Sequence, residues 1–289
     1  MTGEISRIRN RGRIGVVGVG AALSLLAIAG SDAGEKAAPR PDKSDPPETA
    51  TFSIVAVDRE TGEIGVAVQS RIVGVGAIVP WAKAGVGAVA TQAFANVRYG
   101  PVGLLMLELG STPEQTIELL TRQDPLKNRR QIGVIAAAGN AATFTGDECQ
   151  DWAGGRAGDD YAVQGNILAG EAVVEAMAKA FEAGKGKKLL AERLLDALEA
   201  GQTAGGDKRG KQSAALLIVR EGWGYGGLND RFRDIRVDEN PDPIAELRRV
   251  YGKHRALFPR PDGRTTGSPS PAEPGKPKSE AADTDPVPR

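Results

Sequence analysis

The sequence predicts an α+β fold in which two antiparallel β-sheets pack between outer layers of helices. Segments with alternating apolar residues occur in groups, pairs of helical segments separate these groups, and the chain has 38 glycines but only 4% aromatic residues. Grouped strands with short turns are typical of antiparallel sheets, whereas regular alternation of strands and helices would predict a parallel sheet. We therefore expect a four-layer α/β/β/α sandwich, with two antiparallel sheets between helical layers.

The first expected strands form a hairpin. Residues 51–58 (TFSIVAVD) and 63–70 (EIGVAVQS) alternate with a period of two, and the intervening RETG ends in a glycine that suits a tight turn. Residues 71–96 are rich in glycine, small and β-branched residues, and we expect them to continue the same sheet.

Two helices are expected next, at residues 100–110 and from Thr112 onward. Thr112-Pro113-Glu114-Gln115 combines a capping box with proline at the first helical position. The remaining elements are a hairpin at 131–146, a strand at 161–168, helices at 170–184 and 187–201, strands at 213–219 and 232–238, and a helix at 242–254. The resulting order is sheet, two helices, sheet, two helices, sheet.

The first 29 residues have the pattern of an export signal. Four arginines before residue 14 precede an apolar run that ends in the small-x-small sequence Ala27-Ile28-Ala29. An uncleaved membrane anchor is the alternative, because the run is nearly long enough to cross a bilayer. Both interpretations predict contact with the membrane or export machinery, and a periplasmic, secreted or membrane-anchored domain.

The chain flanking the expected domain differs from it in composition. Residues 30–50 and 259–289 are rich in proline and charge and have no apolar periodicity. Such segments cannot bury enough apolar surface to fold. We expect a disordered linker at 30–50, one domain at 51–258 and a disordered tail at 259–289.

The composition also excludes several kinds of function. Lys+Arg and Asp+Glu both number 37, so the chain has no net field that would attract nucleic acid. It has a single cysteine, Cys149, and a single histidine, His254, so no Cys/His zinc cluster can form. Asp159 and Asp160 alone are too few for a metal site, and we expect neither metal nor cofactor. Catalysis, if present, needs a base other than histidine.

Five stretches resemble a known bacterial family in order and in spacing. They are TFSIVAVDRETGEIGVAVQSR, VGAIVPWAKAGVGAVATQAFAN, VQGNIL, GGDKRGKQSAALLIV and GYGGLNDRFRDIRVDENPDPIAELRR. Together they resemble the domain-of-unknown-function family DUF1028, which is placed in the N-terminal nucleophile (Ntn) hydrolase superfamily. The resemblance covers roughly residues 51–254, and it implies an Ntn fold, in agreement with the expected sandwich.

The resemblance implies a catalytic role for Thr51. In Ntn hydrolases the first residue of a strand attacks an amide carbonyl, and its own α-amino group accepts the proton. An α-amino group titrates near about 7.7 to 8.0, so it can act as a base near neutral pH. The implied activity is hydrolysis of a small amide or peptide bond, with Thr51 Oγ1 as the nucleophile.

The sequence departs from this pattern because fifty residues precede Thr51. A free amine requires a cut between Ala50 and Thr51, and Glu48 is a poor fit to signal peptidase, which we expect to cut near Ala29. Self-cleavage is the remaining route. An uncut chain would be a silent Ntn fold, and the alternative function is therefore a non-catalytic ligand-binding or assembly protein.

Three further residues are candidates by their place at or after the end of the expected first hairpin. Gln69-Ser70-Arg71 resembles the Asp-Ser-Arg stretch of proteasomal subunits, although glutamine replaces the acid, and Lys83 falls near the position of the proteasomal lysine. Gln69 and Ser70 are thus candidate substrate-binding residues, and Lys83 is a candidate catalytic residue. An exposed lysine at a strand end is the alternative for Lys83.

Amide side chains at expected strand ends form the next group of candidates. Gln92 and Asn166 are candidate catalytic residues that could stabilise a developing oxyanion, and Asn96 and Gln164 are candidate substrate-binding residues. Helix capping or turn formation is the alternative for each.

The last candidates precede a strand that we expect to be buried. Asp207, Arg209, Gln212 and Ser213 would bind substrate or form a satisfied polar network. Folds of the Ntn superfamily often associate through their helical layers, so the resemblance also implies a homo-oligomer.

Overall fold

The computed structural model describes residues 51–150 and 152–267. The export signal or anchor at 1–29, the linker at 30–50 and most of the expected tail lie outside the described residues. Within the described part, no helix is long and apolar enough to cross a membrane.

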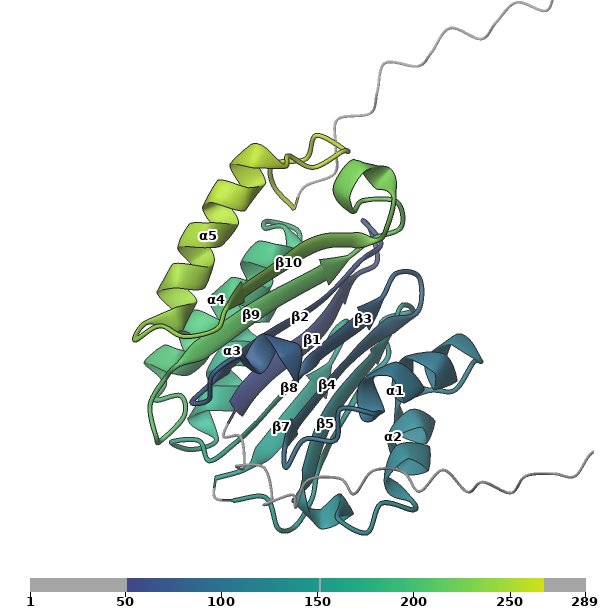
Figure 1. The fold of residues 1–289 in the computed structure, drawn as a ribbon, viewed down its shortest axis with the longest axis vertical. Coiled ribbons are helices and arrows are strands. Elements are labelled where there is room, and N and C mark those ends of the chain that lie inside the picture. The colour runs from purple at the N-terminus through teal and green to yellow at the C-terminus, as the bar shows by residue number, and fades with distance from the viewer. Residues whose placement is uncertain (1–50, 151, 268–289) are drawn as a thin grey trace, which may run out of the picture. The chain divides into compact units, whose positions relative to one another are not determined.

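The described residues form two antiparallel sheets and five α-helices (Figure 1). The strands are β1 Thr51–Asp58, β2 Glu63–Ser70, β3 Pro80–Lys83, β4 Gly87–Ala93, β5 Arg130–Ala136, β6 Ala141–Thr145, β7 Gly154–Gly158, β8 Tyr161–Asn166, β9 Ser213–Val219 and β10 Arg231–Val237. The helices are α1 Tyr99–Glu108, α2 Pro113–Thr121, α3 Ala172–Ala183, α4 Leu190–Thr203 and α5 Pro243–Leu257.

The larger sheet has six strands in the order β10-β9-β2-β1-β8-β7, and the smaller sheet has four in the order β3-β4-β5-β6. β1 occupies the interior of the larger sheet and pairs with β2 on one side and with β8 on the other. In consequence, three strand ends from distant parts of the sequence meet beside Thr51, which pairs with both Ser70 and Asn166.

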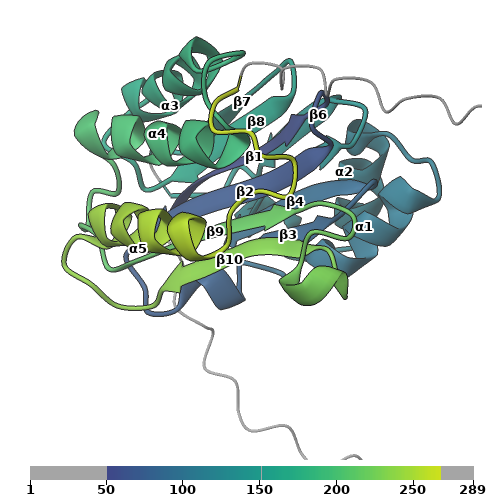
Figure 2. The same cartoon turned by 90° about the horizontal axis from the view of Figure 1, so that it is seen from above.

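Strand alternation divides the apolar residues among three cores. Phe52, Ile54 and Ala56 of β1 face α3, α4 and α5, whereas Val55 and Val57 face the smaller sheet. A third core lies between the smaller sheet and helices α1 and α2. Figure 2 shows these two groups of helices on opposite sides of the paired sheets. The predicted α+β fold with two antiparallel sheets is confirmed.

One sequence prediction about the sheets is wrong, and one strand was not predicted. Residues 71–96 do not continue the first hairpin's sheet, because they supply β3 and β4 of the smaller sheet. β7 (GGRAG) was not expected at all, since its glycines have low strand propensity and it is held by pairing with β8. Periodicity identifies a strand but not the sheet that it joins.

Local signals account for several element boundaries. Thr112 caps α2 by accepting a hydrogen bond from the backbone N–H of Gln115, whose side chain accepts one from Thr112 N in return. The turn between β1 and β2 needs positive φ, which Gly62 supplies at 73°.

The residues after α5 are attached to the first hairpin. Arg260 Nη1 donates a hydrogen bond to Glu63 Oε2 over 2.6 Å, and both side chains are buried. This pair joins Arg260, in the segment that was expected to be a tail, to the second strand of the first hairpin.

Candidate active site

Thr51 lies at the end of β1 where the inner face of the sandwich changes from apolar to polar. Val57 and Val55 belong to the core between the sheets, and Ser53 and Thr51 follow them in the same inward register. Thr51 is fully buried, and its Oγ1 lies 3.1 Å from Ser70 Oγ on the neighbouring strand. The first residue of a central strand thus presents a hydroxyl between the two sheets.

Thr51 belongs to a group of buried polar side chains that we call the inter-sheet polar cluster. Its members come from β1 and from four other strands of the two sheets. They are Thr51, Ser53, Ser70, Gln92, Gln131, Gln164 and Asn166. Ser53 Oγ donates to Gln92 Oε1 over 2.6 Å and accepts from Gln164 Nε2 over 2.7 Å. Gln92 Nε2 lies 3.3 Å from the backbone oxygen of Thr51, so β4 holds the peptide group of the candidate nucleophile.

Gln131 fixes the orientation of the amides around it. Its Nε2 donates to the carbonyl oxygen of Gly165 over 2.8 Å, so its Oε1 faces the other way. This oxygen accepts from Gln92 Nε2 over 2.8 Å and from Asn166 Nδ2 over 2.9 Å. Backbone carbonyls therefore determine which end of each amide is the donor.

The close approach of the sheets at this cluster depends on Gly133. A Cβ atom at Gly133 would lie 2.2 Å from Gln164 Oε1, well inside any allowed contact. Glycine at this position of β5 is thus required for Gln164 to lie between the sheets.

The members of the inter-sheet polar cluster carry hydroxyl and amide groups but no ionisable side chain. Hydroxyl nucleophiles need a base to accept the proton, and neither a hydroxyl nor an amide can serve near neutral pH. Within this cluster, an α-amino group on Thr51 would be the available base.

The structure separates Gln69 from Ser70. Ser70 faces Thr51, whereas Gln69 pairs with Phe52 and points to the helical side of the sheet. Gln69 is fully buried, and neither of its amide atoms has a hydrogen-bond partner among the described residues. Adjacent strand residues face opposite sides, so the two predicted substrate-binding residues cannot share one pocket.

The predicted group at 207–213 forms a loop at the same end of the sheet. Ser213 pairs with Ser70, and Gln212 N donates to the backbone oxygen of Ser70 over 3.0 Å. Asp207 is buried and accepts from Arg209 N over 2.8 Å, and Gln212 Oε1 accepts from Arg71 Nη1 over 2.9 Å. This loop therefore borders the cluster through β2, with its side chains engaged in local contacts.

Lys83 and Asn96 are not brought to Thr51. Lys83 pairs with Gly87 at the opposite end of β4 from Gln92, and its Nζ forms a 2.6 Å ion pair with Glu108 at the surface. Asn96 accepts from the backbone N–H of Arg98 before α1, over 3.2 Å. These contacts fit the alternatives of an exposed strand-end lysine and a helix-start residue.

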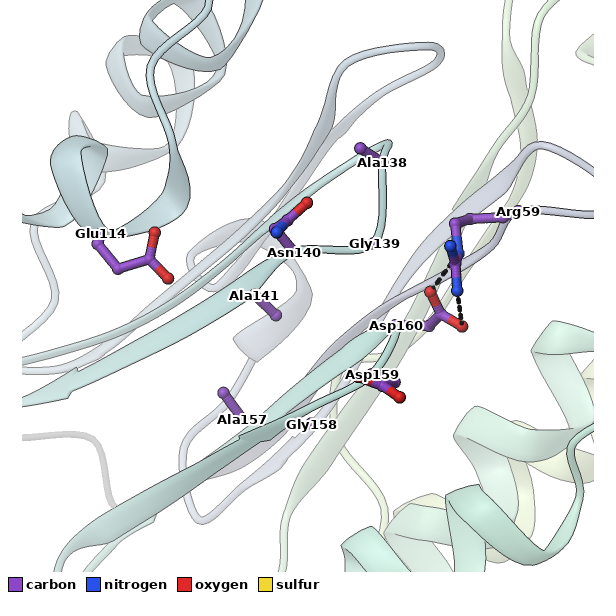
Figure 3. Close-up of a pocket in the computed structure, with 10 residues that line it drawn as sticks. All are labelled: Arg59, Glu114, Ala138, Gly139, Asn140, Ala141, Ala157, Gly158, Asp159 and Asp160. Carbon is purple, nitrogen blue, oxygen red and sulfur yellow. Dashed lines mark hydrogen bonds and ion pairs between the residues drawn. The ribbon is translucent and has the colours of Figure 1, made fainter.

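A polar cavity of about 460 Å³ lies at the far end of the sandwich, beside the last residues of β1 (Figure 3). Arg59 Nε forms a 2.6 Å ion pair with Asp160 there. Burial acts to raise the pKa of Asp160, but hydrogen bonds from Arg59 and Lys185 hold it below its ordinary value. No group of three or more metal-ligating side chains occurs in the described part of the chain.

Sequence reasoning missed Gln131 and Ser53. The alternation of each strand could have identified both residues. Ser53 is two positions from Thr51 and faces the same side of β1. Gln131 faces the same side of β5 as Ile135, which lies in the core between the sheets. The pairing of Gln131 with Gln92 across β4 and β5 was not predictable from either segment alone.

The fold and this site together define a class of α+β sandwich proteins with a threonine at the start of a central strand. A family profile described as "Family of unknown function (DUF1028)" matches residues 51–247, and the chain belongs to this family. The crystal structure of protein SPO2555 from Silicibacter pomeroyi, a DUF1028 member, is similar at 35% sequence identity and a TM-score of 0.65. The match covers 71% of this chain and 86% of that one. No curated protein matches the chain.

Proposed function

We propose that the chain is an Ntn-type amidohydrolase that acts outside the cytoplasm, with Thr51 as its nucleophile after cleavage of the Ala50–Thr51 bond. The position of Thr51 carries this proposal, because its hydroxyl begins a central strand and enters a polar cluster with no other base. The family match, which starts at residue 51, supports the same boundary.

The proposed reaction uses one residue as both nucleophile and base. Thr51 Oγ1 attacks the carbonyl carbon of a small amide or peptide, and the α-amine takes the hydroxyl proton. The tetrahedral intermediate collapses to an ester on Thr51 as the amine leaves with that proton. Water then attacks the ester, which releases the acid and restores the hydroxyl.

Asn166 and Gln92 take different parts in this proposal. Gln92 Nε2 is directed at the backbone oxygen of Thr51 and at Gln131, so it positions the nucleophile. Asn166 pairs directly with Thr51, and one of its amide hydrogens is used by Gln131. Its second hydrogen is the candidate donor to an oxyanion.

Cleavage before Thr51 has two roles in the proposal. It creates the α-amine of Thr51. It also removes the peptide bond that joins the preceding chain to Thr51, a residue that is fully buried. Mass spectrometry and Edman degradation of protein from its native compartment should therefore find a chain that begins Thr-Phe-Ser-Ile. An intact Ala50–Thr51 bond in every molecule would exclude the mechanism.

Substitution of Thr51 tests the chemistry in the cleaved protein. Thr51→Ala should reduce amide hydrolysis by at least about 1,000-fold, and Thr51→Ser should keep part of it, because serine retains the hydroxyl. Hydrolysis should rise with pH as the α-amine loses its proton, near about pH 8. Full turnover by Thr51→Ala would contradict the proposal.

The second candidate function is binding without catalysis on the same fold. The hydrogen-bonded state of the cluster favours it, since Gln92, Gln131 and Ser53 already satisfy one another. Ligand binding that persists in Thr51→Ala, with no turnover by wild type, would support this function over the hydrolase.

A further inference from the structure

An aromatic cavity lies at the end of the molecule remote from Thr51. It has a volume of about 560 Å³ and is bordered by the loop between β9 and β10 and by the end of α5. The chain has only 3 tryptophans, 4 tyrosines and 6 phenylalanines, yet four of these rings line this one cavity: Trp223, Tyr225, Phe232 and Phe258. We call it the aromatic cavity.

The rings of the aromatic cavity are held in place by their neighbours. Trp223 meets Phe232 edge to face with centroids 4.8 Å apart, and the Arg220 guanidinium lies 3.7 Å from the indole centroid. Gly226 and Gly227 adopt φ of 65° and 74°, which few other residues tolerate, so the loop conformation is also specified. The part of the cavity formed by Trp223, Phe232 and the loop backbone is therefore pre-organised.

The rim of the aromatic cavity exposes apolar side chains to solvent. Tyr225 is 78% exposed, Leu257 72% and Leu228, at the end of the same loop, 88%. A concentration of exposed apolar side chains around a cavity is typical of a surface that binds a ligand or a partner. Grooves lined by aromatic rings bind proline-rich segments, whose polyproline II helix loses little entropy on binding.

The chain itself contains a matching segment beyond the described residues. Residues 271–277 read PAEPGKP, with prolines at 271, 274 and 277. A polyproline II helix has three residues per turn, so these three prolines would lie along one face. The spacing therefore matches the periodicity that an aromatic groove recognises.

We propose that the aromatic cavity binds residues 271–277 of the same chain as a polyproline II helix. Pro261 lines the cavity, and Gly267 is only six positions further along the chain, a span of at most about 21 Å. Pro274 is seven residues beyond Gly267, and seven residues can span about 24 Å. The tail is therefore long enough for Pro274 to reach the cavity. The tail then competes with any outside proline-rich partner for the same surface.

The test uses the full chain and the indole N–H signal of Trp223 in NMR spectra, assigned with Trp223→Phe. The triple variant P271A/P274A/P277A should shift this signal while the signals of Trp81 and Trp152 stay in place. P286A/P288A is the matched control, because it removes tail prolines outside the three-residue spacing and should leave the Trp223 signal unchanged.

A synthetic peptide of residues 268–280 tests the same contact in trans. It should bind the triple variant at least about tenfold more tightly than wild type, because the tethered segment competes at an effective concentration near about 1 mM. Adding Tyr225→Ala to the triple variant should abolish peptide binding.

Three results would overturn the proposal. They are an unchanged Trp223 signal in the triple variant, no peptide binding to that variant, and a wild-type Trp223 signal that depends on protein concentration. The last result would show that the segment comes from a second copy. None of these results bears on Thr51, because Thr51 pairs with Ser70 at one end of β2 and the aromatic cavity lies near the other end.

Discussion

At the scale of single residues, Asp124 beside α1 carries a carboxylate whose side chain is largely buried. Its carboxylate accepts hydrogen bonds from Tyr99 over 2.6 Å and from Arg130 over 2.9 Å. Burial acts to raise the pKa of Asp124, but the bonds from Arg130, Tyr99 and the backbone of Leu126 prevail and lower it to about 2. The ionised carboxylate therefore stabilises the folded state.

Asp124→Asn should lower the free energy of unfolding at pH 7 by about 3 kcal/mol, because it leaves Arg130 buried without its counter-charge. The pKa of Asp124 is below its usual 3.8 in the folded state, so part of the wild-type stability is present above about pH 4. That part should be lost as the pH falls from about 4 to about 2. Urea unfolding of both proteins across this range measures the effect.

The exposed pair of Glu118 and Arg122 provides the control. Glu118→Gln should change the free energy of unfolding by less than about 0.5 kcal/mol, because both side chains are solvated. A constant difference between wild type and Asp124→Asn from pH 7 to pH 2 would contradict the assigned role of the carboxylate.

At the scale of elements, β4, β5 and β8 approach closely enough to share one row of amides. Gly133→Ala should destabilise the fold by about 1–3 kcal/mol, because the added Cβ would lie 2.2 Å from Gln164 Oε1 within a fully buried network. Chemical denaturation measures the change.

Gly252→Ala is the matched control for Gly133→Ala. Gly252 lies inside α5 and a Cβ there meets nothing within 4 Å, so alanine should stabilise the helix by about 1 kcal/mol. Equal effects of the two substitutions would show that Gly133 is not needed for close sheet packing.

The elements also show how far the sequence could predict the fold and the site. Alternation and capping identified most strands and helices, and they placed Thr51, Gln92 and Asn166 at strand ends that do meet. These signals are local. The sheet that a strand joins depends on distant residues, and for this reason the sequence predicts the wrong sheet for β3 and β4.

The same limit explains why the structure separates some of the candidate site residues. Gln69 and Ser70 are neighbours in a stretch selected by resemblance, but strand parity places Gln69 on the helical side of the sheet. Gln131 was missed because its importance comes from partners on β4 and β8. Lys83 was placed by resemblance, and its position depends on the register of β3 with β4.

At the scale of the whole molecule, the Glu63–Arg260 pair joins the first hairpin to the chain after α5. Glu63→Gln should lower the free energy of unfolding by about 1–3 kcal/mol, because Arg260 keeps only part of its hydrogen bonding in a buried position. Hydrogen exchange should also become faster in residues 259–267. Glu60→Gln removes the ion pair of Arg264 with the half-exposed Glu60 and should change both quantities much less.

Self-association remains a prediction for the whole molecule. Helix α1 carries apolar residues on its outer side as well as its inner side, with Val102 and Leu105 exposed, and Leu109 directly after the helix is exposed too. A helix that is apolar on both sides is typical of one with a second packing partner. We expect static light scattering to report a dimer or larger species, and a monomer at all concentrations would contradict this expectation.

The position of β1 has a consequence for the maturation that we propose. From Thr51 onward, the strand is already paired with β2 along one edge and with β8 along the other. The described pairs therefore all begin at Thr51 and do not involve the chain in front of it. We expect the domain to assemble first and to be activated afterwards with these pairs in place, and we expect trimmed and untrimmed proteins to melt at nearly the same temperature.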